Sequence, residues 1–249
     1  MSASVLELFK IGIGPSSSHT VGPMKASKVC LTRLSTEAFD SIESVTIDLY
    51  GSLALTGRGH GTDKAIYLGL MGEDPESVDT TTADQSVADI SETNTITLLG
   101  QNKIQFNPEQ DLKFNRMKAL PEHPNAMTIT GSDNNGTQVF EETFFSIGGG
   151  FIKDKKEINA PEPESITVPY NFTSAKELLA HCTNENKLIW EVMIENERAF
   201  QNDEQIEARI GLIWTTMKNC VTRGCETEGI LPGGLNVKRR AAKMMNGLK

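Results

Sequence analysis

The sequence predicts an α+β domain followed by an incomplete all-α domain. Runs in which apolar residues alternate, typical of strands, occur only before residue 160, where they are mixed with helical patterns. After that point the pattern is almost wholly helical. The polar stretch Ala160–Pro169 is rich in proline and has the composition of a connector. We therefore expect one domain over residues 1–159, a linker over 160–170 and a helical domain over 171–249.

The first domain is expected to hold a mixed or antiparallel sheet with helices on one side. Pro23 suits the first position of a helix, because its missing N–H needs no partner there. Apolar residues alternate along Ser44–Tyr50, and Thr62 can cap a following helix, whereas Val78–Asn94 is ambiguous. The expected helices are Ser2–Lys10, Pro23 to Leu34 and Thr62–Met71, and the expected strands are Ser44–Tyr50, Thr95–Leu99, Lys103–Phe106, Ala126–Thr130 and Thr137–Ile147.

The second domain is predicted to contain four helices. Ser174 with Glu177 three residues later has the spacing of a capping box, which marks the start of the first helix. A second helix is expected to begin near Asn186 and a third to span Glu204–Val221. Gly229–Leu235 interrupts the pattern before a fourth helix.

Composition excludes several classes of protein. The 249 residues carry a net charge of −9, which disfavours a nucleic-acid partner because phosphate binding needs a basic face. The basic stretch Lys238–Lys249 is expected to be a solvated helix face, with a binding patch as the alternative. No apolar run reaches the roughly 18–20 residues of a membrane span, and the first ten residues lack signal-peptide character. We therefore expect a cytoplasmic protein that binds no membrane.

The four cysteines are few and scattered, as expected for free thiols in a reducing compartment. Cys220 and Cys225 are five positions apart, which does not match the Cys-x-x-Cys spacing of metal sites. We therefore predict no metal ligands in this chain.

The segment Ile11–Thr20 combines two glycines with Ser16, Ser17, Ser18, His19 and Thr20. Glycine permits tight turns, the hydroxyls can donate hydrogen bonds, and a helix is expected directly after the segment. Such a loop can bind a small anion, for example a carboxylate, while His19 titrates near neutrality. The alternative interpretation is an ordinary serine-rich helix entry.

Two further glycine-rich segments resemble the first. His60 lies between glycines in Gly57–Asp63, which is expected to be a loop between a strand and a helix and therefore favours a functional role. Ser146 precedes Gly148, Gly149 and Gly150, whose backbone N–H groups can be exposed after a strand. Alone, the segment Ser146–Phe151 could also be a flexible strand end, and the Gly229–Leu235 break could be a simple turn.

Four motifs in this order resemble the iron–sulfur-dependent L-serine dehydratases (L-serine ammonia-lyases). The matching segments are Gly14–Met24, Gly59–Asp63, Ser146–Phe151 and Gly229–Ala241. The resemblance runs along the whole chain and implies a β domain joined to a helical α domain. It also implies elimination of water from L-serine to give pyruvate and ammonia, with a [4Fe–4S] cluster acting as Lewis acid.

The resemblance assigns roles to individual residues. His60 and His19 are the expected catalytic residues, with His60 as the acid/base, and Asp63 either orients His60 or caps the next helix. The expected substrate-binding residues are Ser16, Ser17, Ser18, Thr20, Asp63, Ser146, Gly148, Gly149 and Gly150. A homodimer is a further expectation from the family.

The sequence departs from the family in one respect. The cluster cysteines of the family belong to a later part of the α domain, and we expect them beyond residue 249. We therefore expect a truncated form that binds no cluster and has no dehydratase activity alone. The main alternative is a non-enzymatic regulatory module that binds serine. A purely structural or interaction protein is a third possibility.

Overall fold

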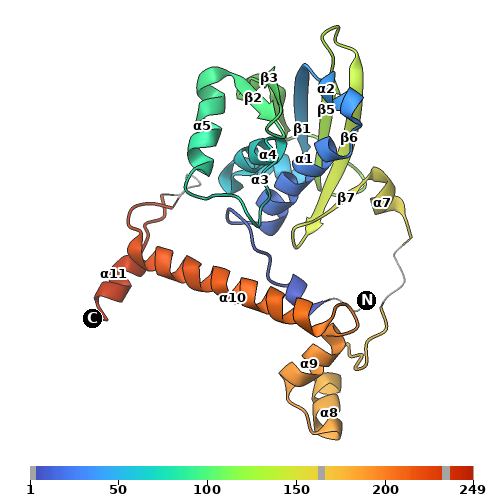
Figure 1. The fold of residues 1–249 in the computed structure, drawn as a ribbon, viewed down its shortest axis with the longest axis vertical. Coiled ribbons are helices and arrows are strands. Elements are labelled where there is room, and N and C mark those ends of the chain that lie inside the picture. Colours follow the sequence, from blue (N-terminus) through green and yellow to red (C-terminus); the bar gives the residue numbers. More distant parts are fainter. Residues whose placement is uncertain (1–3, 162–165, 232–235, 249) are drawn as a thin grey trace. The chain divides into compact units, whose positions relative to one another are not determined.

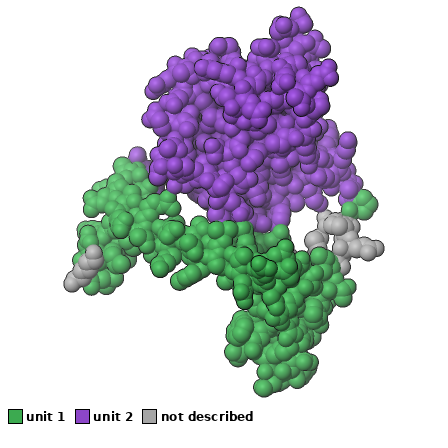
Figure 2. Space-filling model, in the orientation of Figure 1, with its two compact units in different colours: residues 1–9, 161–230, 238–249 green, residues 10–160, 231–237 purple. Residues whose placement is uncertain are grey.

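The computed structural model describes residues 4–161, 166–231 and 236–248. Parts of the expected connector and of the Gly229–Leu235 interruption lie outside these residues. The chain divides into two compact units, which Figure 2 colours separately. The sheet unit comprises Lys10–Ala160 and Leu231–Val237, and the helical unit comprises Met1–Phe9, Pro161–Ile230 and Lys238–Lys249.

The sheet unit contains a mixed sheet with helices, and helices follow it in the chain, which confirms the predicted fold class (Figure 1). Its strands are β1 (Ser44–Tyr50), β2 (Thr95–Leu98), β3 (Asn102–Gln105), β4 (Leu112–Asn115), β5 (Asn125–Ser132), β6 (Gln138–Gly148) and β7 (Phe151–Asp154). Its helices are α1 (Gly22–Thr32), α2 (Thr36–Asp40), α3 (Gly51–His60), α4 (Thr62–Leu70), α5 (Ala83–Thr93), α6 (Pro108–Asp111) and α7 (Lys155–Asn159), and a π-helical turn, Ser17–Val21, precedes α1.

The main sheet has the strand order β4-β1-β5-β6-β7, and β2 and β3 form a separate hairpin. Only β1 and β4 run parallel, whereas the other neighbouring pairs of this sheet are antiparallel. Alternation along β1 buries Val45, Ile47 and Leu49 on the face that α1 and α3 cover. The opposite face is more polar, as shown by the hydrogen bond between the hydroxyls of Thr128 and Thr143 (2.9 Å). An antiparallel sheet with one packed face gives this pattern.

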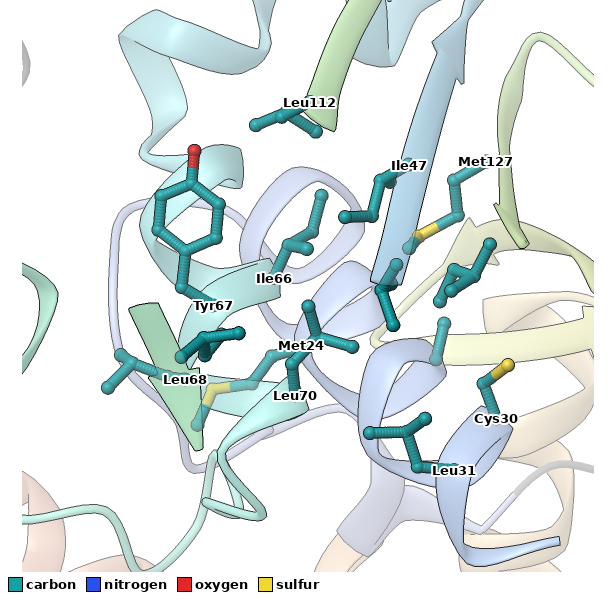
Figure 3. Packing of buried hydrophobic residues seen from close by; sticks show 14 of the residues in the cluster. Met24, Cys30, Leu31, Ile47, Ile66, Tyr67, Leu68, Leu70, Leu112 and Met127 are labelled. Carbon is teal, nitrogen blue, oxygen red and sulfur yellow. The ribbon is translucent and has the colours of Figure 1, made fainter. Parts of the chain in front are cut away.

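The core of the sheet unit lies between the sheet and the helices α1 and α4 (Figure 3). Its fully buried side chains include Met24 and Leu31 of α1, Ile47 of β1, and Ile66 and Leu70 of α4. The two helices approach closely at Gly69 of α4. A Cβ at this position would lie 2.2 Å from the carbonyl oxygen of Met24, so only glycine allows the crossing.

The helical unit is formed by α8 (Ala175–Glu185), α9 (Ile189–Glu197), α10 (Asp203–Glu226), α11 (Ala241–Asn246) and the 3₁₀ helix Val5–Glu7. The sequence assigned residues 1–9 to the first domain, and this assignment differs from the structure. Glu197 is 1% exposed and accepts hydrogen bonds from the Ser4 hydroxyl and from the Val5 N–H. These buried bonds explain why the start of the chain packs with the helical unit.

The predicted cap of α8 is confirmed, with one difference. The Ser174 hydroxyl accepts a hydrogen bond from the Glu177 N–H, whereas the Glu177 carboxylate accepts from the N–H of Thr173 rather than of Ser174. Asn186 adopts a left-handed conformation (φ 51°) and ends α8, so the expected start of a helix there is wrong and α9 begins at Ile189.

The long helix α10 buries only Ile206 among its own residues. Large apolar side chains on its surface include Leu212, Trp214, Met217 and Val221, with Trp214 64% exposed. None of the helices in the described ranges combines the length and hydrophobicity that crossing a membrane requires.

Candidate active site

His19 lies in the π-helical turn Ser17–Val21, where the sequence predicted a loop. Ser16 caps this turn, because its hydroxyl oxygen accepts a hydrogen bond from the His19 N–H (3.1 Å). Gly14 adopts φ +81°, and a Cβ there would lie 2.5 Å from Cγ2 of Thr20. Gly14 and the Ser16 cap therefore fix the direction from which the chain enters the turn. Single π-helical turns are frequent at functional sites.

His60 is the last residue of α3 and Thr62 is the first of α4, so the prediction of a loop from Gly57 to Asp63 is wrong at every position except Gly61. The chain leaves the strand β1 and enters a helix at once, and Gly61, with φ +65°, separates this helix from α4. The Nδ1 atom of His60 lies 2.9 Å from the carbonyl oxygen of Thr56. A carbonyl only accepts, so Nδ1 carries the hydrogen, and Nε2 of the neutral ring carries the lone pair.

The structure brings the two histidines together. Their ring centroids are 4.8 Å apart and the rings are inclined by 37°. Two threonine hydroxyls join the backbones reciprocally: Thr20 donates to the carbonyl oxygen of His60 (2.9 Å), and Thr62 donates to that of His19 (2.5 Å). The expected role of Thr62 as a helix cap is therefore wrong. Gly61 occupies the cap position, and the Thr62 hydroxyl donates to the His19 carbonyl instead.

Serine hydroxyls surround the ring of His19. The Ser18 hydroxyl lies 3.0 Å from Nδ1, and the Ser52 hydroxyl lies 2.9 Å from Nε2. A third hydroxyl, that of Ser16, lies 3.4 Å from that of Ser18. Both ring nitrogens of His19 are thus hydrogen-bonded within the site, whereas Nε2 of His60 has no hydrogen bond to any described residue.

Burial lowers the pKa of His19 from its usual 6.5, and the charge of His60 lowers it further. A hydrogen bond with the backbone of Ser52 opposes both effects on the pKa. His19 is therefore held in its neutral form near pH 7.

A cavity of about 310 Å³ opens beside the histidine pair. His60 and Thr20 line it, and its wall continues over α4 and α5 with Leu68 and Val87 among the apolar residues. Arg58 also lines the cavity, with its guanidinium 5.0 Å from the centre of the Phe114 ring. Of the two histidines, His60 lines the cavity and His19 does not.

Asp63 also lines this cavity. Its Oδ1 accepts a hydrogen bond from the N–H of Lys64 (2.9 Å) in the first turn of α4, and the carboxylate has no hydrogen bond to His60. Asp63 therefore neither hydrogen-bonds to His60 nor caps α4, whose cap position is occupied by Gly61, and its carboxylate lies in the first turn of that helix.

Ser146 lies against the start of α1. A Cβ on Gly22 would lie only 2.1 Å from the Ser146 hydroxyl oxygen, so position 22 requires glycine. Ser146 is 3% exposed, and its hydroxyl has no partner among the described residues. The Asn125 amide donates to the Ser146 carbonyl oxygen (3.3 Å). The third glycine-rich segment therefore packs on the turn that carries His19.

Gly148 ends β6, and Gly149 and Gly150 form the turn to β7; the three glycines have φ values of 97°, 58° and 73°. Gly150 lies against Val21 at the end of the π-helical turn. None of the three lines the cavity. Ser17 contributes its carbonyl oxygen, which accepts from the N–H of Gly22.

Sequence reasoning missed Ser52 and Thr56, which both contact the histidines. Ser52, Thr56 and His60 are spaced by four residues, so they share one face of α3. Recognising a helix from Gly51 onward would have identified them. The glycines in this segment concealed the helix, since glycine disfavours helices in general.

The described residues do not fit a metal cluster. No group of three or more His, Cys, Asp or Glu side chains within them is placed to hold a metal ion. Cys30 is fully buried in the core of the sheet unit, and burial raises the pKa of its thiol to about 12. A neutral, inaccessible thiol is a poor metal ligand.

Comparison with known proteins identifies the family. The family model for the serine dehydratase beta chain matches residues 4–157, and the model for the alpha chain matches residues 184–249. The chain belongs to the serine dehydratase family. This confirms the resemblance inferred from the four motifs, and the beta-chain match includes the entire histidine site.

Relatives in this family are similar over the whole chain. It is 44% identical to an L-serine dehydratase of Streptomyces coelicolor, over 100% of this chain and 55% of the relative. It is 42% identical to an L-serine dehydratase of Haemophilus influenzae (99% and 54%) and 40% identical to L-serine dehydratase 1 of Escherichia coli (97% and 53%). The chain spans about half the length of these relatives.

Proposed function

We propose that this chain binds L-serine and removes its α proton, as its part of the dehydration of L-serine to pyruvate and ammonia. The observation that supports the proposal most strongly is the pair formed by His19 and His60, with ring centroids 4.8 Å apart. Serine hydroxyls adjoin one ring, and a cavity adjoins the other. Hydroxyl donors suit a carboxylate, and the cavity is larger than serine needs.

His60 is the proposed base. Its Nδ1–H is engaged by the Thr56 carbonyl, which leaves the Nε2 lone pair free to take a proton from Cα of the substrate. The partly buried ring of His19 stays neutral and, through the Ser18 hydroxyl, orients the hydroxyl of Ser16 toward the substrate carboxylate. The hydroxyls of Thr20 and Thr62 hold the backbones of the two histidines next to each other.

Departure of the substrate hydroxyl needs an acid or a Lewis acid, which the family resemblance ascribes to a [4Fe–4S] cluster. The described residues do not fit such a cluster. We therefore propose for this chain substrate binding and removal of the α proton, and nothing beyond them.

Titration of the 249-residue chain with L-serine tests the binding. Calorimetry is expected to give saturable binding of L-serine, weaker binding of D-serine, and shifts of the ring signals of His19 and His60 in NMR spectra. His181→Gln is a matched control, because His181 lies in the helical unit and bonds the Asn171 carbonyl. A chain that binds no L-serine, or whose two site histidines do not respond, contradicts the proposal.

Exchange of the α hydrogen of L-serine in D₂O tests the chemistry without requiring the hydroxyl to leave. The wild-type chain is expected to catalyse this exchange, and His60→Gln is expected to slow it by about 10²–10⁴-fold while L-serine still binds. Binding without any exchange in the wild-type chain favours the second candidate, a serine-binding module. That candidate is supported by the serine hydroxyls around His19, which suit a carboxylate whether or not a proton is then removed.

A further inference from the structure

Ser52 has a fixed place at the start of α3. The N–H groups of Gly51 and Ser52 donate to the carbonyl oxygens of Lys118 and Pro124, each at 2.8 Å. Gly51 has φ +52°, and a Cβ there would lie 2.2 Å from the Pro124 carbonyl oxygen. The backbone that carries Ser52 is therefore anchored on two sides, and its hydroxyl meets Nε2 of His19 at 2.9 Å.

Two hydrogen-bond patterns are compatible with the distances around His19, because hydroxyls both donate and accept. In the first, Ser52 donates to Nε2 and the Nδ1–H donates to Ser18, which in turn donates to Ser16. In the second, Ser16 donates to Ser18, Ser18 donates to Nδ1, and the Nε2–H donates to Ser52. The first pattern leaves the O–H of Ser16 unused within the site, and the second leaves the O–H of Ser52 unused.

The position of α3 favours the first pattern. Ser52 lies in the first turn of this ten-residue helix. The positive end of the helix dipole there stabilises the lone pair on Nε2 of His19 and disfavours a hydrogen on that nitrogen. The hydroxyl oxygen of Ser16 already accepts from the His19 N–H, which leaves its own proton free to donate outward from the glycine-rich segment. A carboxylate is the ligand group that such a free donor suits.

We propose that Ser52 is a positioning residue whose hydroxyl donates to Nε2 of His19 and holds the ring in the Nδ1–H tautomer. The Ser18 hydroxyl then donates to Ser16, which leaves the hydroxyl proton of Ser16 free for a bound carboxylate. This inference rests on the proposed binding of L-serine, because it assigns the donor for the substrate carboxylate. Ser52 acts through His19 and needs no contact with the substrate.

The ¹⁵N resonances of the histidine rings test the tautomer directly, and this measurement needs no variant. The wild-type chain near pH 7.5 is expected to show His19 as the Nδ1–H tautomer. Ser52→Ala is expected to yield a mixture of tautomers, and Ser52→Thr is expected to restore the wild-type signals, while His60 stays unchanged in all three. A wild-type Nε2–H tautomer, or a Ser52→Ala variant with an unaltered ring, overturns the proposal.

Affinity for L-serine tests the consequence for the carboxylate. Ser52→Ala is expected to weaken binding by about 3- to 10-fold, the size of one hydrogen bond, and Ser52→Thr is expected to restore it. Ser41→Ala is the matched control, since Ser41 bonds the Ala38 carbonyl outside the site. An unchanged affinity in Ser52→Ala overturns the link to the carboxylate. If the wild-type chain binds no L-serine, the proposed function fails, while the tautomer measurement still decides the role of Ser52.

Discussion

Two histidines with the same chemistry have different surroundings in this site. In the ring of His60, Nδ1 is bound to a carbonyl and Nε2 has no hydrogen bond within the described part of the chain, which defines the tautomer and leaves an acceptor beside the cavity. The ring of His19 has both nitrogens bound to hydroxyls. The first arrangement suits proton transfer, and the second suits orientation of neighbouring hydroxyls.

The lowered pKa of His19 predicts a loss of stability in acid. Above its unfolded value of 6.5, both the folded and the unfolded states carry a neutral ring, so His19 contributes nothing. As the pH falls below 6.5, the unfolded chain binds a proton that the folded chain resists, and the free energy of unfolding decreases until the pH passes the lowered folded pKa.

Urea unfolding between about pH 7.5 and about pH 5 measures this effect. The amide signals of β1 report on the sheet unit, and His19→Asn is expected to lose less stability over this range than the wild type. Because the other titrating groups are shared, the difference between the two chains isolates His19. An equal loss in both chains contradicts the prediction.

At the scale of elements, the π-helical turn and α1 are positioned by close contacts at glycines. Gly22 meets the side chain of Ser146 on β6, and Gly69 meets the backbone of Met24. The first contact involves a side chain that can be changed, whereas the second involves a carbonyl oxygen that cannot. The two positions therefore differ in whether a second substitution can restore packing.

Gly22→Ala is expected to destabilise the sheet unit by about 1–3 kcal/mol, because the new methyl group overlaps with the Ser146 side chain. Adding Ser146→Gly removes both atoms that the methyl group meets, Oγ at 2.1 Å and Cβ at 2.9 Å, and is expected to recover most of this loss. Urea unfolding of the four chains of this double-mutant cycle measures the coupling. Additive effects of the two substitutions contradict the contact between β6 and α1.

At the scale of the whole molecule, the four cysteines are divided between the units. Cys30 is in the core of the sheet unit, while Cys182, Cys220 and Cys225 belong to the helical unit. The large apolar side chains on α10 are a second feature of the helical unit. Within the described residues, the histidine pair belongs to the sheet unit, and no three His, Cys, Asp or Glu side chains are placed to hold a metal ion.

Anaerobic incubation of the 249-residue chain with iron and sulfide is expected to give no [4Fe–4S] absorbance and no pyruvate from L-serine. The physical reason is that Cys30 is inaccessible, with a thiol pKa raised to about 12, and that the described residues bring no three ligands together. Cys30→Ala serves as a control and is expected to behave identically. Stoichiometric iron with a brownish absorbance and pyruvate formation contradicts this prediction.

The sequence alone determined the family, the order of the main elements and the identity of most residues near the site. Alternation along β1 and the hairpin β5–β6 were readable because a period of two is a local property of strands. The motifs around His19 and His60 were readable because glycines next to histidine are rarely useful in a core.

The tertiary structure alone decided that Gly51–His60 is a helix, that residues 4–9 pack with the helical unit, and that Ser52 contacts His19. Helix propensity counts each glycine as unfavourable, yet packing of α3 on the sheet outweighs that local preference. Ser52 and His19 are 33 residues apart, and no local pattern encodes a hydrogen bond between them. Such contacts form only when separate elements are brought together by burial of their apolar faces.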